Sequence, residues 1–310
     1  MVAIDIAFQV IFISQTGMGT LGNSILLGLC IFRFLTGHKL KPIDILLTHL
    51  AFVNTVVLLS KGIPQTMAAF GINNFLDENG CKLVTYFHRV ARGLSLCTTS
   101  LLTGFQAITI KSRSSRWAGF KAKVQKLIIP FCFLFWALNL LTNISVYVYI
   151  RGPRQSNNAT ERQEFIYCSF SHVSGHISIF AIVTSLLDLG CMGIMVCTTI
   201  SMVLVLQRHH KQIQYIHSNN FIPGDSPETR ATQAMLQLVS IFVSFYMLNS
   251  IMACYMCFFK PNPWIVYTSA FLASCFPAYS PFVMIMRDSQ VLRYCMTFWQ
   301  KIKLLSLHCP

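Results

Sequence analysis

Residues 83–110, LVTYFHRVARGLSLCTTSLLTGFQAITI, form an apolar stretch long enough to cross a bilayer as a helix, yet charged residues lie well inside it. His88, Arg89 and Arg92 all fall in its first half. A charged side chain at such a depth is costly in lipid, so it normally faces a protein interior or a water-filled cavity. We therefore expect this segment to form the central wall of a polar site inside a bundle of helices.

The whole chain has the composition of an integral membrane protein. Of its 310 residues, 54% are hydrophobic and only 11% are charged, whereas soluble domains carry roughly 25% charged residues. Apolar windows long enough to span a bilayer recur along the chain. We predict an all-α integral membrane protein, a single seven-transmembrane helix bundle over residues 1–310 followed by a short cytoplasmic tail. The expected spans are residues 8–32, 43–70, 83–110, 127–150, 176–206, 234–258 and 264–286, and the tail is residues 287–310.

The distribution of Lys and Arg predicts the orientation. Basic residues gather after the first, third, fifth and seventh spans and are few on the opposite side, so the positive-inside rule places the N-terminus outside and the C-terminus in the cytoplasm. The formal net charge of +14 is then a topology signal, with attraction to anionic membrane lipid as a side effect. Nucleic acid is not an expected partner. The residues expected to face the cytoplasm are Lys111, Arg113, Arg116, Arg208 and Lys211.

Features typical of an oxidising compartment fall on the opposite, outer side. Cys81 lies just before the third span, and Cys168 lies in the loop between the fourth and fifth. A disulfide between them would tie this loop to the third span. In the same loop, Asn158 begins a sequence that matches the N-glycosylation signal.

Few ionisable residues lie deep in the spans: Lys61, His88, Arg89, Arg92 and Asp188. At a helix rise of about 1.5 Å per residue, those of the second, third and fifth spans reach similar depths, roughly 14 to 18 Å from the outer side. Two interpretations stay open. The residues form an ion-pair network that holds three helices together, or they line a ligand pocket open to the outside. Because the fixed cations outnumber the single carboxylate, an anionic or electron-rich small molecule would complement the site.

No catalytic constellation is apparent in the sequence. The chain offers no nucleophile–base pair, nucleotide-binding loop or metal cluster, so we expect a protein that is not an enzyme and needs no cofactor. A small-solute transporter or channel would also place charge inside a bundle. Transporters typically show repeated halves with paired broken helices, and no internal repeat is visible here.

Several long strings in the chain resemble those of vomeronasal type-1 receptors, and they run over nearly its whole length. They are THLAFVN (48–54), KGIPQTMAAFG (61–71), GCKLVTYFHRVARG (80–93), FQAITI (105–110), SPETRATQAMLQLVSIFVSFY (226–246) and FPAYSPFVMI (276–285). The resemblance implies a helix bundle of the G-protein-coupled receptor type. It also implies a chemosensory receptor that detects pheromone-like small molecules and acts through an inhibitory-class heterotrimeric G protein. The basic residues expected in the cytoplasm would then face this G protein, namely Lys111, Arg113, Arg116, Arg208 and Lys211.

The resemblance also assigns roles to individual residues. By position, Cys81 and Cys168 match the receptor disulfide, and His88, Arg89 and Arg92 match the HRxxRG element of the family. The third span ends ITIKSR, so it lacks the Asp-Arg-Tyr motif of rhodopsin-like receptors, as the family generally does. The chain also departs from the usual ITIS-Pro ending of the family, because Lys111 follows Ile110. A bitter-taste-type chemoreceptor, which shares the architecture, is the alternative within the class, but its motifs are not evident.

Overall fold

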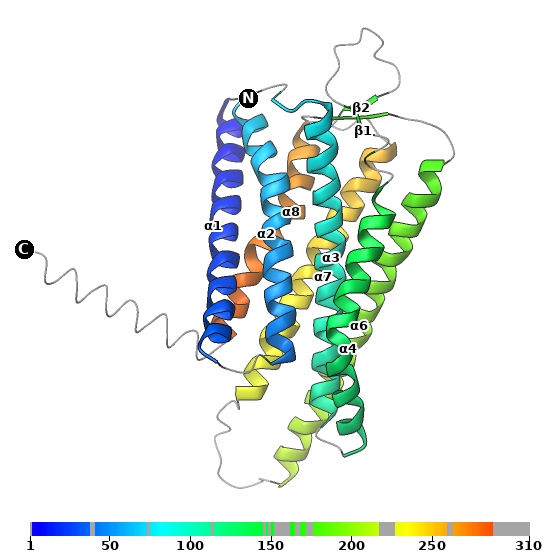
Figure 1. Cartoon of the computed structure of the whole chain (residues 1–310). Coiled ribbons are helices and arrows are strands. Elements are labelled where there is room, and N and C mark those ends of the chain that lie inside the picture. Colours follow the sequence, from blue (N-terminus) through cyan, green and yellow to red (C-terminus); the bar gives the residue numbers. More distant parts are fainter. Residues whose placement is uncertain are drawn as a thin grey trace, which may run out of the picture.

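The computed structural model shows a bundle of long helices standing side by side (Figure 1). It describes residues 2–37, 41–72, 75–112, 115–144, 147, 150–151, 162–164, 168–171, 176–216, 227–258 and 263–287. Seven long helices lie in these ranges: α1 (Val2–Leu35), α2 (Pro42–Ala69), α3 (Glu78–Lys111), α4 (Ser115–Thr142), α6 (His176–Ile216), α7 (Pro227–Phe258) and α8 (Pro263–Arg287). The predicted all-α bundle is therefore confirmed.

Most of these helices are long and apolar enough to cross a membrane. Judged by length and composition of the described residues, six qualify, namely α1, α2, α3, α4, α6 and α8. The seventh, α7, contributes a shorter apolar stretch, Val239–Met252. The helices also run past the expected spans at several ends. For example, α6 continues to Ile216, ten residues beyond the expected limit at residue 206.

The fourth helix departs most from its expected span, residues 127–150. It begins at Ser115 and ends at Thr142, and Ile150 belongs to a short strand. At its start, the Lys-rich residues 121–126 continue the helix beyond the apolar window, because Lys forms helices well. At its end, β-branched residues such as Ile150 had extended the apolar window, although they favour strands.

A small antiparallel sheet lies at one end of the bundle, which we call the sheet end (Figure 1). Strand β3 (Ser169–Ser171) is central and pairs with β1 (Ile150–Arg151) and β2 (Arg162–Glu164). A disulfide joins Cys168, directly before β3, to Cys81 in the first turn of α3. The cysteine pair implied by the family resemblance is thus bonded, and it fixes the sheet to the start of α3.

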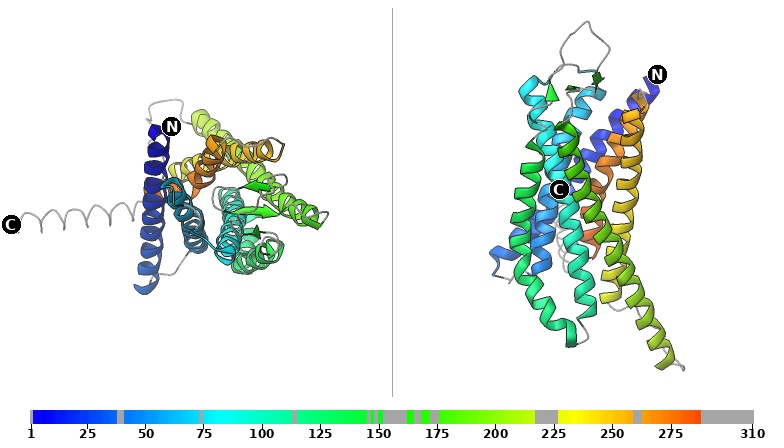
Figure 2. Two further views of the ribbon diagram at one scale, coloured as in Figure 1. Left: turned by 90° about the horizontal axis from the view of Figure 1, so that it is seen from above. Right: turned by 90° about the vertical axis from the view of Figure 1, so that its right-hand side faces the viewer.

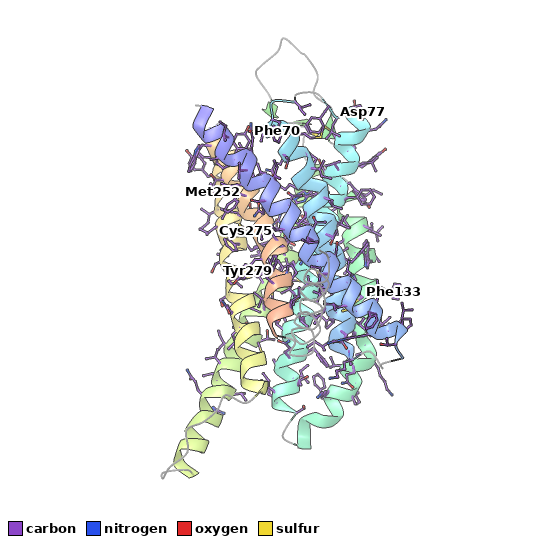
Figure 3. All side chains as sticks on the ribbon, turned by 90° about the vertical axis from the view of Figure 1, so that its left-hand side faces the viewer. Phe70, Asp77, Phe133, Met252, Cys275 and Tyr279 are labelled. Atoms are coloured by element: carbon purple, nitrogen blue, oxygen red, sulfur yellow. A yellow bond between two sulfur atoms is a disulfide. The ribbon has the colours of Figure 1, made fainter. Side chains whose placement is uncertain are left out.

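Helix α3 is the central wall of the bundle, as expected. In its membrane-length segment 67% of the residues are buried, compared with 11% for α4 and 17% for α6. Figure 2 shows, from above, α1 at the edge of the bundle. Helix α3 contacts α2, α4, α6 and α7. Large apolar side chains such as Phe133 point away from the bundle (Figure 3), where lipid would solvate them.

Small residues bring α1 and α8 into close contact. A Cβ atom added to Gly19 would lie only 2.8 Å from Cα of Ala278, so the backbones touch at this point. Beside this contact, the Asn23 amide donates to the carbonyl oxygen of Pro277 at 2.9 Å. Pro281 has no N–H to reach that carbonyl one turn earlier in α8. A side chain of α1 therefore replaces the missing hydrogen bond of α8.

A chain of hydrogen bonds attaches the largely exposed α4 to α2 and α3. The Trp136 indole N–H donates to Nε2 of His49 at 2.8 Å, and Nδ1 of His49 lies 2.9 Å from Oγ1 of Thr98. Because the indole can only donate, Nε2 must accept and Nδ1 must carry the proton of a neutral ring. The Thr98 hydroxyl in turn donates to the carbonyl of Leu94 at 2.7 Å. Each polar group of these three side chains therefore has a hydrogen-bond partner, which favours one fixed arrangement of the three helices.

Candidate ligand site

Arg92, Asp188 and Tyr246 meet at the junction of α3, α6 and α7. Nη2 of Arg92 lies 3.9 Å from Oδ2 of Asp188. The Tyr246 hydroxyl donates a hydrogen bond to the same carboxylate oxygen, and the Arg92 guanidinium lies over the Tyr246 ring, 4.9 Å from its centroid. A single carboxylate thus holds both a cation and a phenol, and three helices contribute one side chain each.

Three further basic side chains surround Arg92. The charge of Arg92 acts on both Lys61 and Arg89, and His88 is close enough to interact with Lys61, Arg89 and Arg92. The Nδ1 atom of His88 is buried and has no hydrogen-bond partner among the described residues. Lys61, Arg89 and Arg92 carry like charges that repel one another, and within the described part of the chain Asp188 is the only carboxylate among them. The site therefore carries an excess of positive charge.

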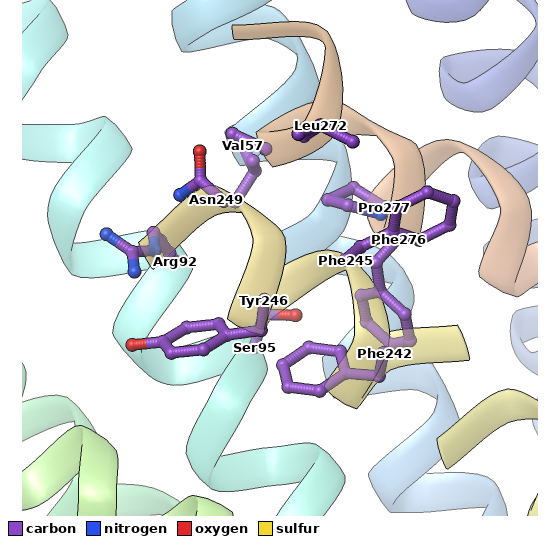
Figure 4. A pocket seen from close by; sticks show the side chains of 11 residues that line it. Val57, Arg92, Ser95, Phe242, Phe245, Tyr246, Asn249, Leu272, Phe276 and Pro277 are labelled. Carbon is purple, nitrogen blue, oxygen red and sulfur yellow. The ribbon is translucent and has the colours of Figure 1, made fainter. Parts of the chain in front are cut away.

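A small cavity of about 40 Å³ opens beside this cluster, between α2, α3, α7 and α8. Figure 4 shows Arg92 and the Tyr246 ring on one side and the Phe242 and Phe276 rings on the other. The Phe242 ring meets the Phe276 ring edge-on at a centroid distance of 4.2 Å. On the polar side, Oδ1 of Asn249 accepts a hydrogen bond from Ser269 at 3.0 Å. The cavity combines one cation, a few polar groups and an aromatic wall.

The five candidate ligand residues come together as one cluster, but they do not share one surface. Of Lys61, His88, Arg89, Arg92 and Asp188, only Arg92 lines the cavity. Its side chain is 37% exposed, and that of Asp188 is 31% exposed, so their ion pair is not sealed from its surroundings. Arg92 therefore links the charged cluster to the aromatic cavity.

Tyr246 is the residue of the site that the sequence argument missed. Aromatic residues count as apolar in a hydropathy window, so a tyrosine inside an apolar span gives no signal of its own. The usable signal was chemical. A buried tyrosine hydroxyl usually finds a partner, and a carboxylate with a free acceptor was already expected at similar depth. The missing step was the rotation of α7, which the sequence does not give.

Those residues expected to face a G protein that the structure describes belong to the end of the bundle opposite the sheet. Lys111 ends α3, and Arg208 is an exposed residue in the last part of α6. Arg116 and Lys211 fall on α4 and α6, but their side chains are not among those described. Arg113 and Asn158 lie outside the described residues.

The chain is similar over most of its length to proteins of known family. The model of the vomeronasal organ pheromone receptor family matches residues 6–297. Human vomeronasal type-1 receptor 1 is 42% identical over 287 residues, which are 92% of this chain and 81% of the relative. Human vomeronasal type-1 receptor 4 is 42% identical over 292 residues, 93% of this chain and 96% of the relative. Olfactory receptor class A-like protein 1 of Danio rerio is 32% identical over 280 residues, 88% of this chain and 87% of the relative.

Proposed function

The chain belongs to the vomeronasal organ pheromone receptor family, and from this premise we propose that it is a plasma-membrane receptor for a small anionic molecule that signals through an inhibitory-class heterotrimeric G protein. At a coarser level, it is a multi-pass membrane chemosensory receptor, with a ligand and a G protein as partners. Its family is one of receptors and not of enzymes.

The cationic cluster carries the proposal of an anionic ligand. Lys61, His88 and Arg89 interact with Arg92 or with each other, and Asp188 is the one carboxylate described among them. An anionic group that reaches Arg92 through the cavity would relieve this repulsion and gain a charge-assisted hydrogen bond. The aromatic wall of α7 and α8 would then contact the apolar body of the ligand.

The small size of the cavity supports a mechanism by population shift. Ligand pockets commonly measure about 300 to 1,000 Å³, far more than the cavity of about 40 Å³ between α3 and α7. A ligand must therefore favour an arrangement in which these helices stand further apart. It can shift the equilibrium only by its differential affinity for the two arrangements. We call the arrangement with the helices further apart open and the one described above closed. In this mechanism the Tyr246–Asp188 hydrogen bond, which joins α7 to α6, stabilises the closed arrangement.

The proposed orientation places the sheet end outside the cell. The Cys81–Cys168 disulfide lies at this end, and disulfides persist in the oxidising extracellular space. Basic residues, including Lys111 and Arg208, lie at the opposite end, as the positive-inside rule requires of a cytoplasmic face.

The test uses two substitutions that remove one side each of the same ion pair. A panel of small anions and their neutral analogues is applied to transfected cells, with inhibition of cAMP production as the readout. We expect Arg92→Ala to weaken the response roughly 10- to 100-fold, because a hydrogen bond to a charged group is lost. Asp188→Asn removes the competing carboxylate, so it should leave the potency of the anion unchanged or raise it.

A purely structural role of the ion pair gives the opposite pattern. In that case both variants lose surface expression together, and the response per surface receptor stays the same in each. That result, or a preference for neutral analogues in the wild type, would refute the anionic ligand. Substrate flux without signalling would refute the receptor mechanism as a whole.

A further inference from the structure

The amide of Gln106 is an unusual group near the far end of α3. Gln106 lies five residues before the end of the helix at Lys111, which is about 7.5 Å along its axis. Its side chain is 7% exposed, and both Nε2 and Oε1 are buried without a hydrogen-bond partner in the described part of the chain. Among the described side chains, no other has two buried polar atoms that both lack partners.

Three buried threonines of α3 are satisfied by the carbonyl groups of their own helix, Thr98, Thr99 and Thr103. Thr98 donates to the carbonyl of Leu94, and Thr99 donates to that of Ser95, each at 2.7 Å. A hydroxyl on Cβ is short enough to reach back one turn. The Gln106 amide sits two carbons further out and lies beyond those carbonyls. An apolar side chain of equal length would fill the same space without the cost of burying two unpaired groups.

The position of Gln106 indicates what would pair with it. It lies about 21 Å along α3 from Arg92, so it is remote from the ligand site. The surrounding end of the bundle is basic, with exposed Lys123, Lys126 and Arg208 on α4 and α6. Figure 1 shows α6 and α7 continuing past the end of α2 on this side of the bundle. A polypeptide segment that carries negative charge would be attracted to this basic end of the bundle.

We propose that Gln106 is a contact residue for the G protein, and that its amide pairs with the peptide backbone of a G-protein segment inserted beside the end of α3. A primary amide presents a donor and an acceptor side by side, which matches the C=O and N–H groups of a peptide chain. The surrounding lysines and Arg208 would attract the negative charge of the segment, while the neutral amide of Gln106 would form hydrogen bonds with its backbone. This inference rests on the proposed function, because it requires that the receptor couples to a G protein.

The burial of the amide makes this contact specific to one state. In the closed arrangement neither polar atom of Gln106 reaches solvent. The contact forms only when the helices that cover this end of α3 separate, so it stabilises the open arrangement and contributes nothing to the closed one. This is the differential interaction that a coupled equilibrium requires.

Ligand-free nucleotide exchange on a purified G protein tests the inference. Wild-type receptor and Gln106→Met are reconstituted in lipid nanodiscs with inhibitory-class heterotrimer, and the rate of GTPγS uptake is measured. The matched control is Gln65→Met, since Gln65 is 2% exposed and its Oε1 also lacks a partner, but it lies near the end of α2 on the sheet side. We expect about a tenfold loss of exchange with Gln106→Met and none with Gln65→Met.

The outcomes separate this inference from the function on which it rests. If the wild type promotes exchange on no class of G protein, either without ligand or with any member of the anion panel, the proposed function is wrong and the inference falls with it. If the wild type is active and Gln106→Met equals it, or if Gln65→Met loses as much, only the inference is wrong. Should Gln106→Met fail to give a monodisperse receptor, Gln106→Asn draws the amide back by one methylene and should show the same loss, whereas full activity would refute the contact.

Discussion

Removal of the Tyr246 hydroxyl should activate the receptor in the absence of ligand. In Tyr246→Phe the ring stays under the Arg92 guanidinium and against Phe242, and only the hydrogen bond to Asp188 is lost. A hydrogen bond to a charged group contributes about 1.5 to 3 kcal/mol. Asp188 is 31% exposed, so solvent screening reduces this to about 1 kcal/mol. If the bond is present only in the closed arrangement, the population of the open one rises about fivefold.

The assay is ligand-free GTPγS exchange at equal amounts of receptor. The matched control is Tyr279→Phe, the same change at an exposed position on α8, which should leave the basal rate unchanged. A basal rate for Tyr246→Phe equal to that of the wild type would show that the hydrogen bond persists in the open arrangement. A lower rate would show that the bond stabilises the open arrangement, and either result would refute the proposed role of Tyr246.

Three further substitutions test the packing of the bundle. Gly19→Leu should lower thermal stability by about 1 to 3 kcal/mol, because the new side chain would overlap the α8 backbone. The control Gly17→Leu should leave stability unchanged, because nothing lies within 4 Å of a Cβ atom added there. Equal melting temperatures for the two variants would contradict this expectation. Trp136→Phe removes the hydrogen bond to α2 and should cost about 1 kcal/mol in a thermal-shift assay. Cys81→Ser opens a disulfide across 87 residues and should abolish surface expression, unlike Cys197→Ser at an exposed thiol.

Sequence reasoning predicted the charged cluster because intramembrane charge is a strong constraint. Depth along a helix follows from the constant rise per residue, and charge must turn away from lipid. Together these rules predicted that Lys61, Arg92 and Asp188 lie at a similar depth and turn inward, and the structure pairs Arg92 with Asp188. The position of Lys61 near Arg92 follows from the same argument.

What sequence reasoning missed depends on the rotation of helices and on contacts between them. Tyr246 joins the site because of how α7 is turned about its axis, and a hydropathy window contains no such information. The hydrogen bonds among His49, Thr98 and Trp136 likewise depend on how three helices face one another. The end of α4 at Thr142 was missed because apolar strand formers and apolar helix formers look alike in a window.

The hydrogen bond from Asn23 to the Pro277 carbonyl has a consequence for how this sequence can change over evolutionary time. Pro281 creates the unfilled acceptor in α8, and Asn23 fills it from another helix. Loss of Asn23 alone would leave a carbonyl unpaired, whereas loss of Pro281 alone would leave the asparagine competing with a restored backbone donor. The two positions are therefore bound to each other as mutational partners, although 258 positions separate them in the chain. A substitution at one of these positions is therefore tolerated only together with a compensating substitution at the other.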